Sequence, residues 1–376
     1  MKIKDAGSMT NIQTLDTPTL LLDHQKLLTN IKDIANFAKQ QGVSYRPHIK
    51  THKSVKIAQM QVEAGAVGVT TAKISEAEVM AAGGIKDILI AYPISNPEKI
   101  NRLIKLLQKG VQLKAAVDNP ESLRYLQSGL EHTPYTLEVW IKVNSGLNRC
   151  GVEPGEEAVL LAKAIKNHSK LKLGGIFTHA GHSYAAKSYE EIQNIGLQEG
   201  YAVVKSAILC ELAGIPIPVR SVGSTPTYKI AGKVPGITEI RPGNAVFFDA
   251  IQVGLGVTNI ENCAVTLLAS VVGVYNDRIV FDTGSKCLCL DKGAHGNQTV
   301  SGFGKIIGHP EVMIERLSEE HGVGIFVNGT NLKLNDKVQI IPNHACTVVN
   351  QFEDYTLHEN GRVIDVWKVD ARGMVK

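Results

Sequence analysis

Short apolar runs alternate with longer amphipathic runs along most of the chain up to about residue 241. One amphipathic run places Leu27, Ile31 and Ile34 at helical spacing, between Asp23 as its expected N-cap and Gly42 as its stop. Apolar runs that are typical of strands lie at 44–48, 68–71, 88–92, 114–117, 138–143, 173–178, 220–223 and 238–241. Eight strands alternating with helices are the number that a closed parallel barrel requires, so we expect a (β/α)8 TIM-like barrel.

The pattern changes after about residue 250, where strand-like runs dominate. They lie at 264–275, 278–282, 324–327, 337–341 and 362–369. Asn-Asp or Asn-Gly pairs at 276–277, 328–329 and 360–361 indicate tight turns after several of them. The chain is therefore expected to be of the α/β plus β class. We predict a barrel over residues 24–250 and a C-terminal β domain over residues 251–376.

The composition is that of an ordinary globular protein. The 376 residues are 44% hydrophobic and 20% charged, and the net charge of +4 gives no reason to expect a nucleic-acid partner. The polar start at residues 1–13 does not resemble a signal peptide, and the longest apolar run, 264–275, is too short to span a bilayer. The six cysteines are scattered, which argues against a disulfide framework. We expect a cytoplasmic enzyme that binds neither nucleic acid nor membrane.

The most informative segment is the basic run at residues 46–53, which follows the first expected barrel strand. In extended geometry Arg46, His48 and Lys50 share one face, at the strand end where barrel enzymes keep their chemistry. Neighbouring positive charges favour the neutral amine of Lys50, which can attack an aldehyde and form a Schiff base. The alternative is a solvated basic strand end that binds an anion.

Two glycine-containing loops follow the last two expected barrel strands. The first contains Ser224 and Thr225 after a glycine, and the second contains Gly243 and Asn244. Consecutive backbone N–H groups with a hydroxyl bind phosphate, and loops late in a barrel are the usual phosphate site of this architecture. Ordinary glycine turns are the alternative for both loops.

Three further groups lie where chemistry is expected. Arg149 follows the strand at 138–143, although it has possible ion-pair partners in Glu153 and Glu156. His179 and Tyr184 follow the strand at 173–178, where a histidine is often only structural.

The third group is His344 and Cys346, which in extended structure point the same way. Both side chains would then be able to hold one metal ion, although such a pair also arises by chance.

Several motifs, taken in order, resemble the D-threonine aldolase and D-serine dehydratase family of pyridoxal-phosphate enzymes, which have the alanine racemase-like fold. The resemblance covers about residues 17 to 373. Its motifs are Thr-Pro-Thr-Leu-Leu-Leu-Asp at 17–23, Pro-His-Ile-Lys-Thr-His-Lys-Ser at 47–54, Asn-Arg-Cys-Gly-Val at 148–152, Arg-Pro-Gly-Asn at 241–244, Pro-Asn-His-Ala-Cys at 342–346 and Asp-Val-Trp with Ala-Arg-Gly between 365 and 373. It implies that residues 17–23 join the β domain.

The resemblance also implies roles for the candidate residues. Lys50 holds pyridoxal 5′-phosphate as a Schiff base and acts as the base. The phosphate contacts are Thr225, Gly243 and Asn244, with Ser224 in the same loop. The resemblance also supports Arg149 near the pyridine ring. From their position at a strand end, His179 is expected over the ring and Tyr184 at the phosphate or the ring edge.

In that family, His344 and Cys346 fall where the metal ligands lie, and a thiolate with an imidazole suits zinc, with manganese as the other candidate. Cysteine stands where the D-threonine aldolase branch carries aspartate, so the chain resembles the D-serine dehydratase branch more closely.

The expected reaction is β-elimination from a D-β-hydroxy amino acid such as D-serine or D-threo-3-hydroxyaspartate. Retro-aldol cleavage in the same site, an amino-acid racemase and a non-catalytic pyridoxal-phosphate carrier remain the alternatives. The family's habit suggests a homodimer.

Overall fold

The computed structural model describes residues 10–293 and 296–376 and divides the chain into two compact units. The barrel unit contains Ile31–Gly243 together with Met374–Lys376, and the β unit contains the segment that ends at Asn30 together with Asn244–Gly373. The sequence pattern placed the boundaries at residues 24 and 250. The structure shifts them because α1 (His24–Gln41) begins in the β unit, and because the segment that follows Gly243 packs with the β unit.

All eight expected barrel strands are present, and every neighbouring pair of strands is parallel. Their order is β2-β9-β8-β7-β6-β5-β4-β3, and a bridge between His48 and Thr70 joins the segment after β2 to β3. The strands are β2 (Ser44–Tyr45), β3 (Val69–Thr71), β4 (Asp87–Ile90), β5 (Gln112–Val117), β6 (Leu137–Lys142), β7 (Leu171–Phe177), β8 (Val219–Val222) and β9 (Glu239–Ile240). The prediction of an alternating β/α barrel is confirmed.

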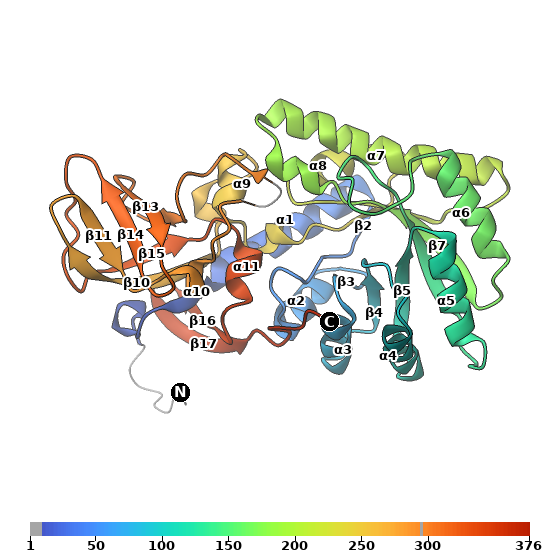
Figure 1. Cartoon of the computed structure of the whole chain (residues 1–376), viewed down its shortest axis with the longest axis horizontal. Coiled ribbons are helices and arrows are strands. Elements are labelled where there is room, and N and C mark those ends of the chain that lie inside the picture. The colour runs from blue at the N-terminus through green and yellow to red at the C-terminus, as the bar shows by residue number, and fades with distance from the viewer. Residues whose placement is uncertain (1–9, 294–295) are drawn as a thin grey trace. The chain divides into compact units, whose positions relative to one another are not determined.

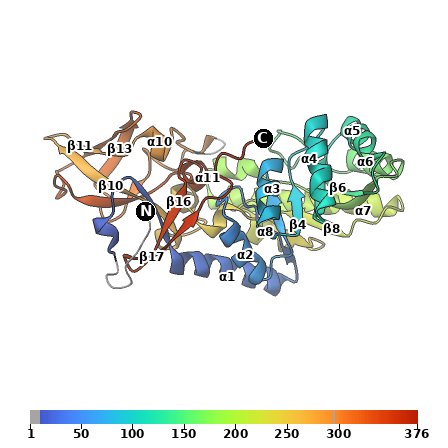
Figure 2. The ribbon, with the colours of Figure 1, turned by 90° about the horizontal axis from the view of Figure 1, so that it is seen from below.

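Helices lie outside this curled sheet (Figures 1 and 2). The two ends of α1 are as the sequence predicts. Asp23 accepts a hydrogen bond from the Lys26 N–H at 3.0 Å, and Gly42 ends the helix with φ +65°. The helices of this unit after α1 are α2 (Val55–Glu63), α3 (Ile74–Ala82), α4 (Pro97–Gln108), α5 (Pro120–Leu130), α6 (Glu156–Lys166), α7 (Tyr189–Leu212) and α8 (Tyr228–Ala231), with the 3-10 helix η2 (Gly181–Ala185) between β7 and α7.

The β unit is a mostly antiparallel sheet in the order β13-β14-β11-β10-β1-β16-β17, with β12 and β15 attached to β10 through β15. β1 pairs with β10 and with β16, so the N-terminal strand belongs to this sheet. The strands are β1 (Thr19–Asp23), β10 (Val265–Val274), β11 (Arg278–Phe281), β12 (Lys305–Ile306), β13 (Val312–Leu317), β14 (Gly322–Phe326), β15 (Lys337–Ile341), β16 (Asp354–Glu359) and β17 (Arg362–Lys368). The sequence pattern missed β12, β13 and β16.

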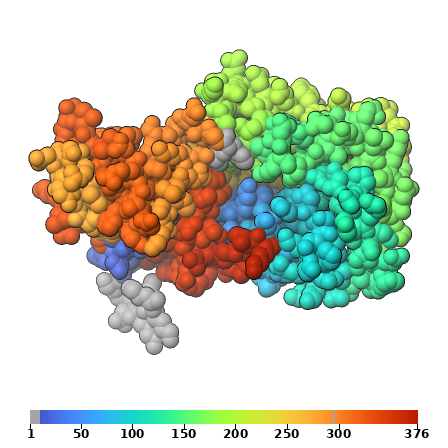
Figure 3. All heavy atoms as spheres, in the orientation of Figure 1, coloured from blue at the N-terminus to red at the C-terminus, as the bar shows by residue number. Residues whose placement is uncertain are grey.

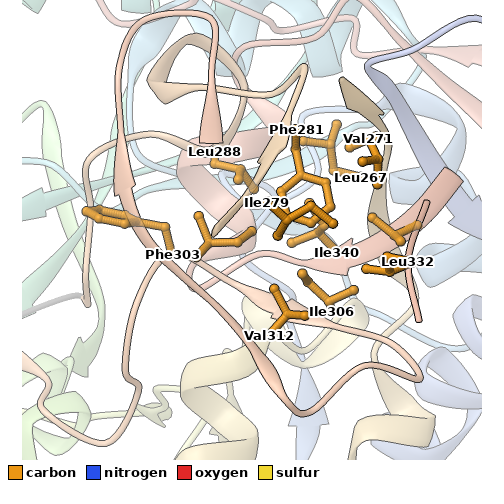
Figure 4. Close-up of a cluster of buried hydrophobic side chains, with 13 residues drawn as sticks. Leu267, Val271, Ile279, Phe281, Leu288, Phe303, Ile306, Val312, Leu332 and Ile340 are labelled. Carbon is orange, nitrogen blue, oxygen red and sulfur yellow. The ribbon is translucent and has the colours of Figure 1, made fainter. Parts of the chain in front are cut away.

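Short helices complete the described part of the β unit, and side chains from several strands form its core. The α-helices are α9 (Ala250–Gly254), α10 (Ser285–Leu288) and α11 (Ala345–Val349), and the 3-10 helices are η1 (Ile12–Thr14), η3 (Asn244–Val246) and η4 (Ile260–Asn262). In the core cluster Phe281, Ile279 and Ile340 are fully buried, and side chains from β10, β11, β13 and β15 gather around them (Figure 4). This apolar core supports the segments that carry the chemistry of the β unit.

All six cysteines are free, in agreement with the expectation of no disulfide framework. Among the described residues, no helix is long and apolar enough to cross a membrane.

A buried histidine next to Lys50 makes the stability of the protein depend on pH. Burial lowers the pKa of His52 to about 3, whereas an unfolded histidine titrates near about 6.5. Between these values only the unfolded chain binds the proton, so the free energy of unfolding falls as the pH drops below about 6.5. His52 should contribute about 2 kcal/mol to the loss between pH 7.5 and pH 5.

Urea unfolding at the two pH values measures this loss. His52→Asn keeps an acceptor for the Ser54 N–H, which donates to the His52 Nδ1 at 3.1 Å, but it removes the titration. The variant should therefore lose less stability than the wild type on acidification. An equal loss in both proteins would contradict the role of His52.

Candidate active site and metal centre

Lys50 lies in a tight turn between β2 and α2, at the carboxyl end of the barrel strand. The backbone N–H of His48 donates to Pro242 O at 3.1 Å, and the N–H of Ile49 donates to Thr70 O at 2.9 Å. Lys53 ends the turn with φ +50°. Lys50 itself is partly buried, and its N–H donates to the His48 Nδ1 at 3.3 Å. The turn is thus fixed from both neighbouring strands, which holds the lysine at the face where barrels carry their active sites.

Two of the cations that were expected to crowd Lys50 are paired with carboxylates instead. Arg46 lies within the barrel and bonds to Glu239 at 3.0 Å and to Asp87. The Lys53 Nζ donates to the buried Glu76 at 2.8 Å. The carboxylate partners of these two residues offset part of their positive charge.

Other basic side chains contribute positive charge around Lys50. Burial, followed by the charge of Lys50, lowers the pKa of both His48 and His179 well below the usual range, so both imidazoles are neutral at neutral pH. Arg241 and Lys142 add smaller contributions of the same sign to His48. Lys50 and His179, which the sequence separates widely, are therefore brought together by the fold.

The fold also fixes the tautomer of His179. Its Nδ1 lies 3.0 Å from Gly223 O, and a carbonyl oxygen can only accept, so Nδ1 carries the proton. With the neutral ring established, Nε2 has a free lone pair and acts as an acceptor or a base. The structure thus gives His179 a defined chemical character that sequence position alone did not.

The two glycine loops approach their neighbours too closely for a side chain. Gly223 has φ +140°, and a Cβ there would lie 2.7 Å from Arg241 N. A Cβ on Gly243 would lie 3.1 Å from both the Cβ and the carbonyl oxygen of His48. Glycine therefore lets the first loop close on the Arg241 segment and the second loop close on the segment that carries Lys50, as a phosphate-binding backbone requires.

The predicted phosphate contacts differ in what their side chains do. Ser224 and Thr225 are both buried, and the Ser224 hydroxyl lies 2.9 Å from that of Ser183 and 3.0 Å from that of Thr227. The amide Nδ2 of Asn244 donates to Asp249 at 2.6 Å within the β unit. The backbone groups of these residues are therefore the better candidates for a phosphate.

Arg149 is exposed, and its charge contributes to the lowered pKa of His179, after burial and Lys50. Glu153, a possible partner, instead accepts from the Asn144 Nδ2 at 2.8 Å. Tyr184 is buried within η2. Arg149 thus lies near the His179 side of the Lys50 cluster.

Sequence reasoning missed Lys142, the last residue of β6. Its side chain is buried, and its Nζ donates to Ala91 O at 3.1 Å. Burial lowers its pKa, and its contact with Cys150 opposes this effect. The sequence offered one signal for this residue, because a lysine at the end of an apolar barrel strand lies at the edge where barrels carry their active sites.

The donor set of the barrel unit fits pyridoxal 5′-phosphate. Positive charge comes from Lys50, Lys142, Arg149 and Arg241, and the Gly243 loop presents backbone close to the lysine turn. A phosphate dianion and a substrate carboxylate are the anions that such a cluster accommodates.

In the β unit, His344 and Cys346 form the candidate metal pair, although not in the expected geometry. His344 is the N-cap of α11, and Cys346 lies in its first turn, so the prediction of an extended pair is wrong. The two side chains nevertheless contact each other by a hydrogen bond. The imidazole and the thiol are thus adjacent, as ligands of one metal ion must be.

A buried carboxylate that the sequence did not reveal orients the imidazole of His344. The Asp249 Oδ2 accepts from the His344 Nδ1 at 3.1 Å, from the Ala345 N–H at 3.0 Å and from the Asn244 Nδ2. Its Oδ1 accepts from the Gln252 N–H at 3.1 Å. Burial disfavours a charged imidazole, but Cys346 and Asp249 outweigh it and raise the pKa of His344 above its usual value.

This arrangement fits a divalent metal. Because Nδ1 is directed at Asp249, Nε2 is the ring nitrogen that would coordinate a metal, and a carboxylate behind a histidine is the usual support of a metal ligand. Within the described ranges no group of three or more His, Cys, Asp or Glu forms a closed site. Two protein ligands leave positions open for water or substrate, as in catalytic rather than structural centres.

Comparisons with known families agree with this division of the chain. Residues 22–250 match the family model described as alanine racemase, N-terminal domain, and residues 264–358 match the putative serine dehydratase domain. The first model alone covers more than half of the chain.

Relatives are similar over nearly the whole length. D-threo-3-hydroxyaspartate dehydratase from Delftia sp. (strain HT23) is 33% identical, over 94% of this chain and 97% of that protein. 3-Hydroxy-D-aspartate aldolase from Paracoccus denitrificans (strain Pd 1222) is 32% identical, over 96% and 92%. A solved structure of a cysteine-to-alanine mutant of D-threo-3-hydroxyaspartate dehydratase, in the metal-free form, matches with a TM-score of 0.89 and 30% identity, over 96% of this chain and 98% of that one.

The barrel that carries Lys50, the serine dehydratase domain that carries His344 and Cys346, and the full-length similarity lead to one assignment. The chain is a lyase of the alanine racemase N-terminal domain family, in the group that includes D-threo-3-hydroxyaspartate dehydratase, D-serine dehydratase and D-threonine aldolase.

Proposed function

We propose that the protein is a pyridoxal-phosphate- and metal-dependent dehydratase of D-β-hydroxy amino acids. The observation that carries this proposal is the position of Lys50 in a fixed turn, among basic side chains and beside the Gly243 loop. A cationic environment of this kind suits a phosphate ester and a substrate carboxylate, and a lysine at a strand end is a nucleophile for an aldehyde.

The chain's own residues then have defined tasks. The Nζ of Lys50 would hold the cofactor covalently, and as an amine at the site it would act as the base for the α-proton of the substrate. When bound, pyridoxal phosphate supplies the electron sink that makes this proton acidic. His179, neutral and protonated on Nδ1, presents Nε2 as an acceptor near Lys50. The Ser224–Thr225 and Gly243–Asn244 loops bind the phosphate.

His344 and Cys346 hold the divalent metal in this proposal, with zinc favoured by the thiol and imidazole pair. The metal would supply Lewis-acid assistance to the β-hydroxyl of the substrate. Asp249 keeps the His344 ring oriented. The name of the metal-free dehydratase mutant, in which a cysteine is replaced, supports a metal in related enzymes.

The overall reaction is the loss of water from the amino acid, followed by hydrolysis of the released enamine to a keto acid and ammonia. D-Serine would give pyruvate, and D-threo-3-hydroxyaspartate would give oxaloacetate. The cysteine at position 346 and the 33% identical dehydratase favour this reaction.

Retro-aldol cleavage is the second candidate, because an aldolase is 32% identical over nearly the same length. It would convert D-threo-3-hydroxyaspartate to glycine and glyoxylate.

Product analysis separates the two reactions. Purified protein with pyridoxal phosphate and zinc or manganese is incubated with D-serine, D-threonine and D-threo-3-hydroxyaspartate. We expect ammonia and keto acid in equal amounts, and turnover that stops when a chelator removes the metal while the cofactor absorbance persists. Glycine with an aldehyde would favour the aldolase, and absence of turnover on every substrate would contradict both assignments.

A further inference from the structure

One buried carboxylate of the barrel unit has no part in the chemistry described above. Glu199 lies on α7, which runs along the outside of this unit, where its yellow-green atoms form the upper edge in the space-filling view (Figures 1 and 3). Although the helix is at the surface, Glu199 is fully buried. Burial of a carboxylate costs free energy, because desolvation disfavours its charge. A buried carboxylate therefore needs hydrogen-bond donors that offset this cost.

The structure shows what Glu199 holds. Its Oε1 accepts from the Gly223 N–H at 2.9 Å and from the Ala180 N–H at 3.3 Å, and its Oε2 accepts from the Thr227 hydroxyl. These donors belong to two different loops, one after β7 and one after β8. Burial raises the pKa of Glu199, and the bonds from Thr227, Gly223 and Ala180 oppose this effect.

Glycines on α7 allow the helix to come close enough for these bonds. A Cβ on Gly196 would lie 2.9 Å from the Ile230 Cβ, and a Cβ on Gly200 would lie 2.6 Å from Val234. Both glycines flank Glu199 on the face of α7 that packs against α8 and its neighbours. The two glycines thus let α7 lie close enough for the Glu199 carboxylate to reach the loop that precedes α8.

The carboxylate also anchors a chain of hydroxyl groups. The Thr227 hydroxyl donates to Glu199, and its oxygen lies 3.0 Å from the Ser224 hydroxyl. The Ser183 hydroxyl, which donates to Ala180 O at 2.7 Å, lies 2.9 Å from Ser224 on the other side, so the Ser224 proton is shared between two acceptors of this chain. These bonds hold the Gly223–Thr227 loop against α7 and against the segment after β7.

We propose that Glu199 is a positioning residue that shapes the Gly223–Thr227 loop to receive the phosphate ester of the cofactor. The inference rests on the proposed function, because it assumes that this loop binds the phosphate. The two bonds of Gly223 support the inference, because its N–H donates to Glu199 and its carbonyl oxygen accepts from the His179 Nδ1. One carboxylate thereby fixes both the phosphate loop and a neighbour of Lys50.

The test compares two ligands that differ only in the phosphate, pyridoxal 5′-phosphate and pyridoxal. Their dissociation constants are measured by absorbance titration of the cofactor-free protein, and the ratio reports the contribution of the phosphate. Glu199→Gln keeps the size but reverses the bond to Thr227, and should weaken pyridoxal-phosphate binding about tenfold with little change for pyridoxal. Glu199→Leu removes every acceptor and should cost about a hundredfold.

Two further variants serve as a matched control and as a test of the hydroxyl link. Glu211→Gln makes the same change on the same helix, at an exposed residue that pairs with Arg220, and should leave the ratio unchanged. Thr227→Val removes only the hydroxyl link, and its effect should be non-additive with that of Glu199→Gln. Thr227→Val and Glu199→Gln remain informative if Glu199→Leu does not fold.

The outcomes separate the inference from the proposed function. A wild type that prefers the phosphorylated ligand, with an unchanged preference in Glu199→Gln, would overturn the role of Glu199 and leave the proposed function standing. Equal weakening of both ligands would also overturn it, because a general loss of structure acts on both. A wild type that binds neither ligand would remove both proposals.

Discussion

Replacement of Lys50 by alanine should abolish covalent binding of pyridoxal phosphate and lower kcat by about 10⁴-fold or more. The reason is that one amine serves both as the attachment point and as the base for the α-proton. Borohydride reduction of the wild type, followed by peptide mapping, should place the label on Lys50. The variant should show no label and no absorbance band of the bound cofactor in its covalent form.

The controls use the other lysines near the site. Lys50→Arg retains the positive charge but cannot form the bond, and should be as inactive as the alanine variant. Lys142→Ala should keep the label on Lys50, because the Lys142 Nζ is engaged with Ala91 O. A label on Lys142 or Lys53, or normal turnover in Lys50→Ala, would refute the assignment of Lys50.

The barrel was predictable because parallel strands are buried on both faces and therefore read as continuous apolar runs. β4 and β5 illustrate this, since nearly all of their side chains are buried. β13 and β16 were missed because only one face of each is buried, and charged or polar side chains interrupt the run. The tight turn at 360–361, by contrast, was visible, and both of its residues have positive φ.

The site was predictable only as far as its residues lie in short motifs. Lys50, His344 and Cys346 belong to such motifs, whereas Glu199 reads as one more polar position on a long helix. Its burial depends on the close approach of α7 to the loop before α8, which the pair of glycines at 196 and 200 signals only weakly. Long-range contacts of this kind leave no local pattern.

Asp249 was hidden for a similar reason. Locally it is the N-cap of α9, and it accepts from the Gln252 N–H, so the sequence gives it an ordinary capping role. Its contact with the His344 Nδ1 joins residues that lie far apart in the chain. The expected extended geometry of His344 and Cys346 failed because a helix begins between them, and the helical turn brings them together in a different way.

Removal of the Cys346 thiol should eliminate tight metal binding and, with it, the dehydratase reaction. Cys346→Ala leaves His344 as the one remaining ligand of the proposed pair, and a single imidazole does not retain a catalytic metal. Asp249→Asn keeps both ligands but weakens the support of the imidazole, so it should lower the metal affinity about 10- to 100-fold. Competition with a chelating dye measures both effects without reference to turnover.

Cobalt substitution identifies the thiolate directly, because a cobalt–thiolate bond gives a charge-transfer band in the near ultraviolet. The band should be present in the wild type and in Asp249→Asn at saturating cobalt, and absent in Cys346→Ala. Cys289→Ala is the matched control: burial raises the pKa of that thiol, so it stays protonated and is a poor ligand. A band that persists in Cys346→Ala and disappears in Cys289→Ala would move the metal to the other thiol, and dehydration that continues at full rate in Cys346→Ala would remove the metal from the reaction.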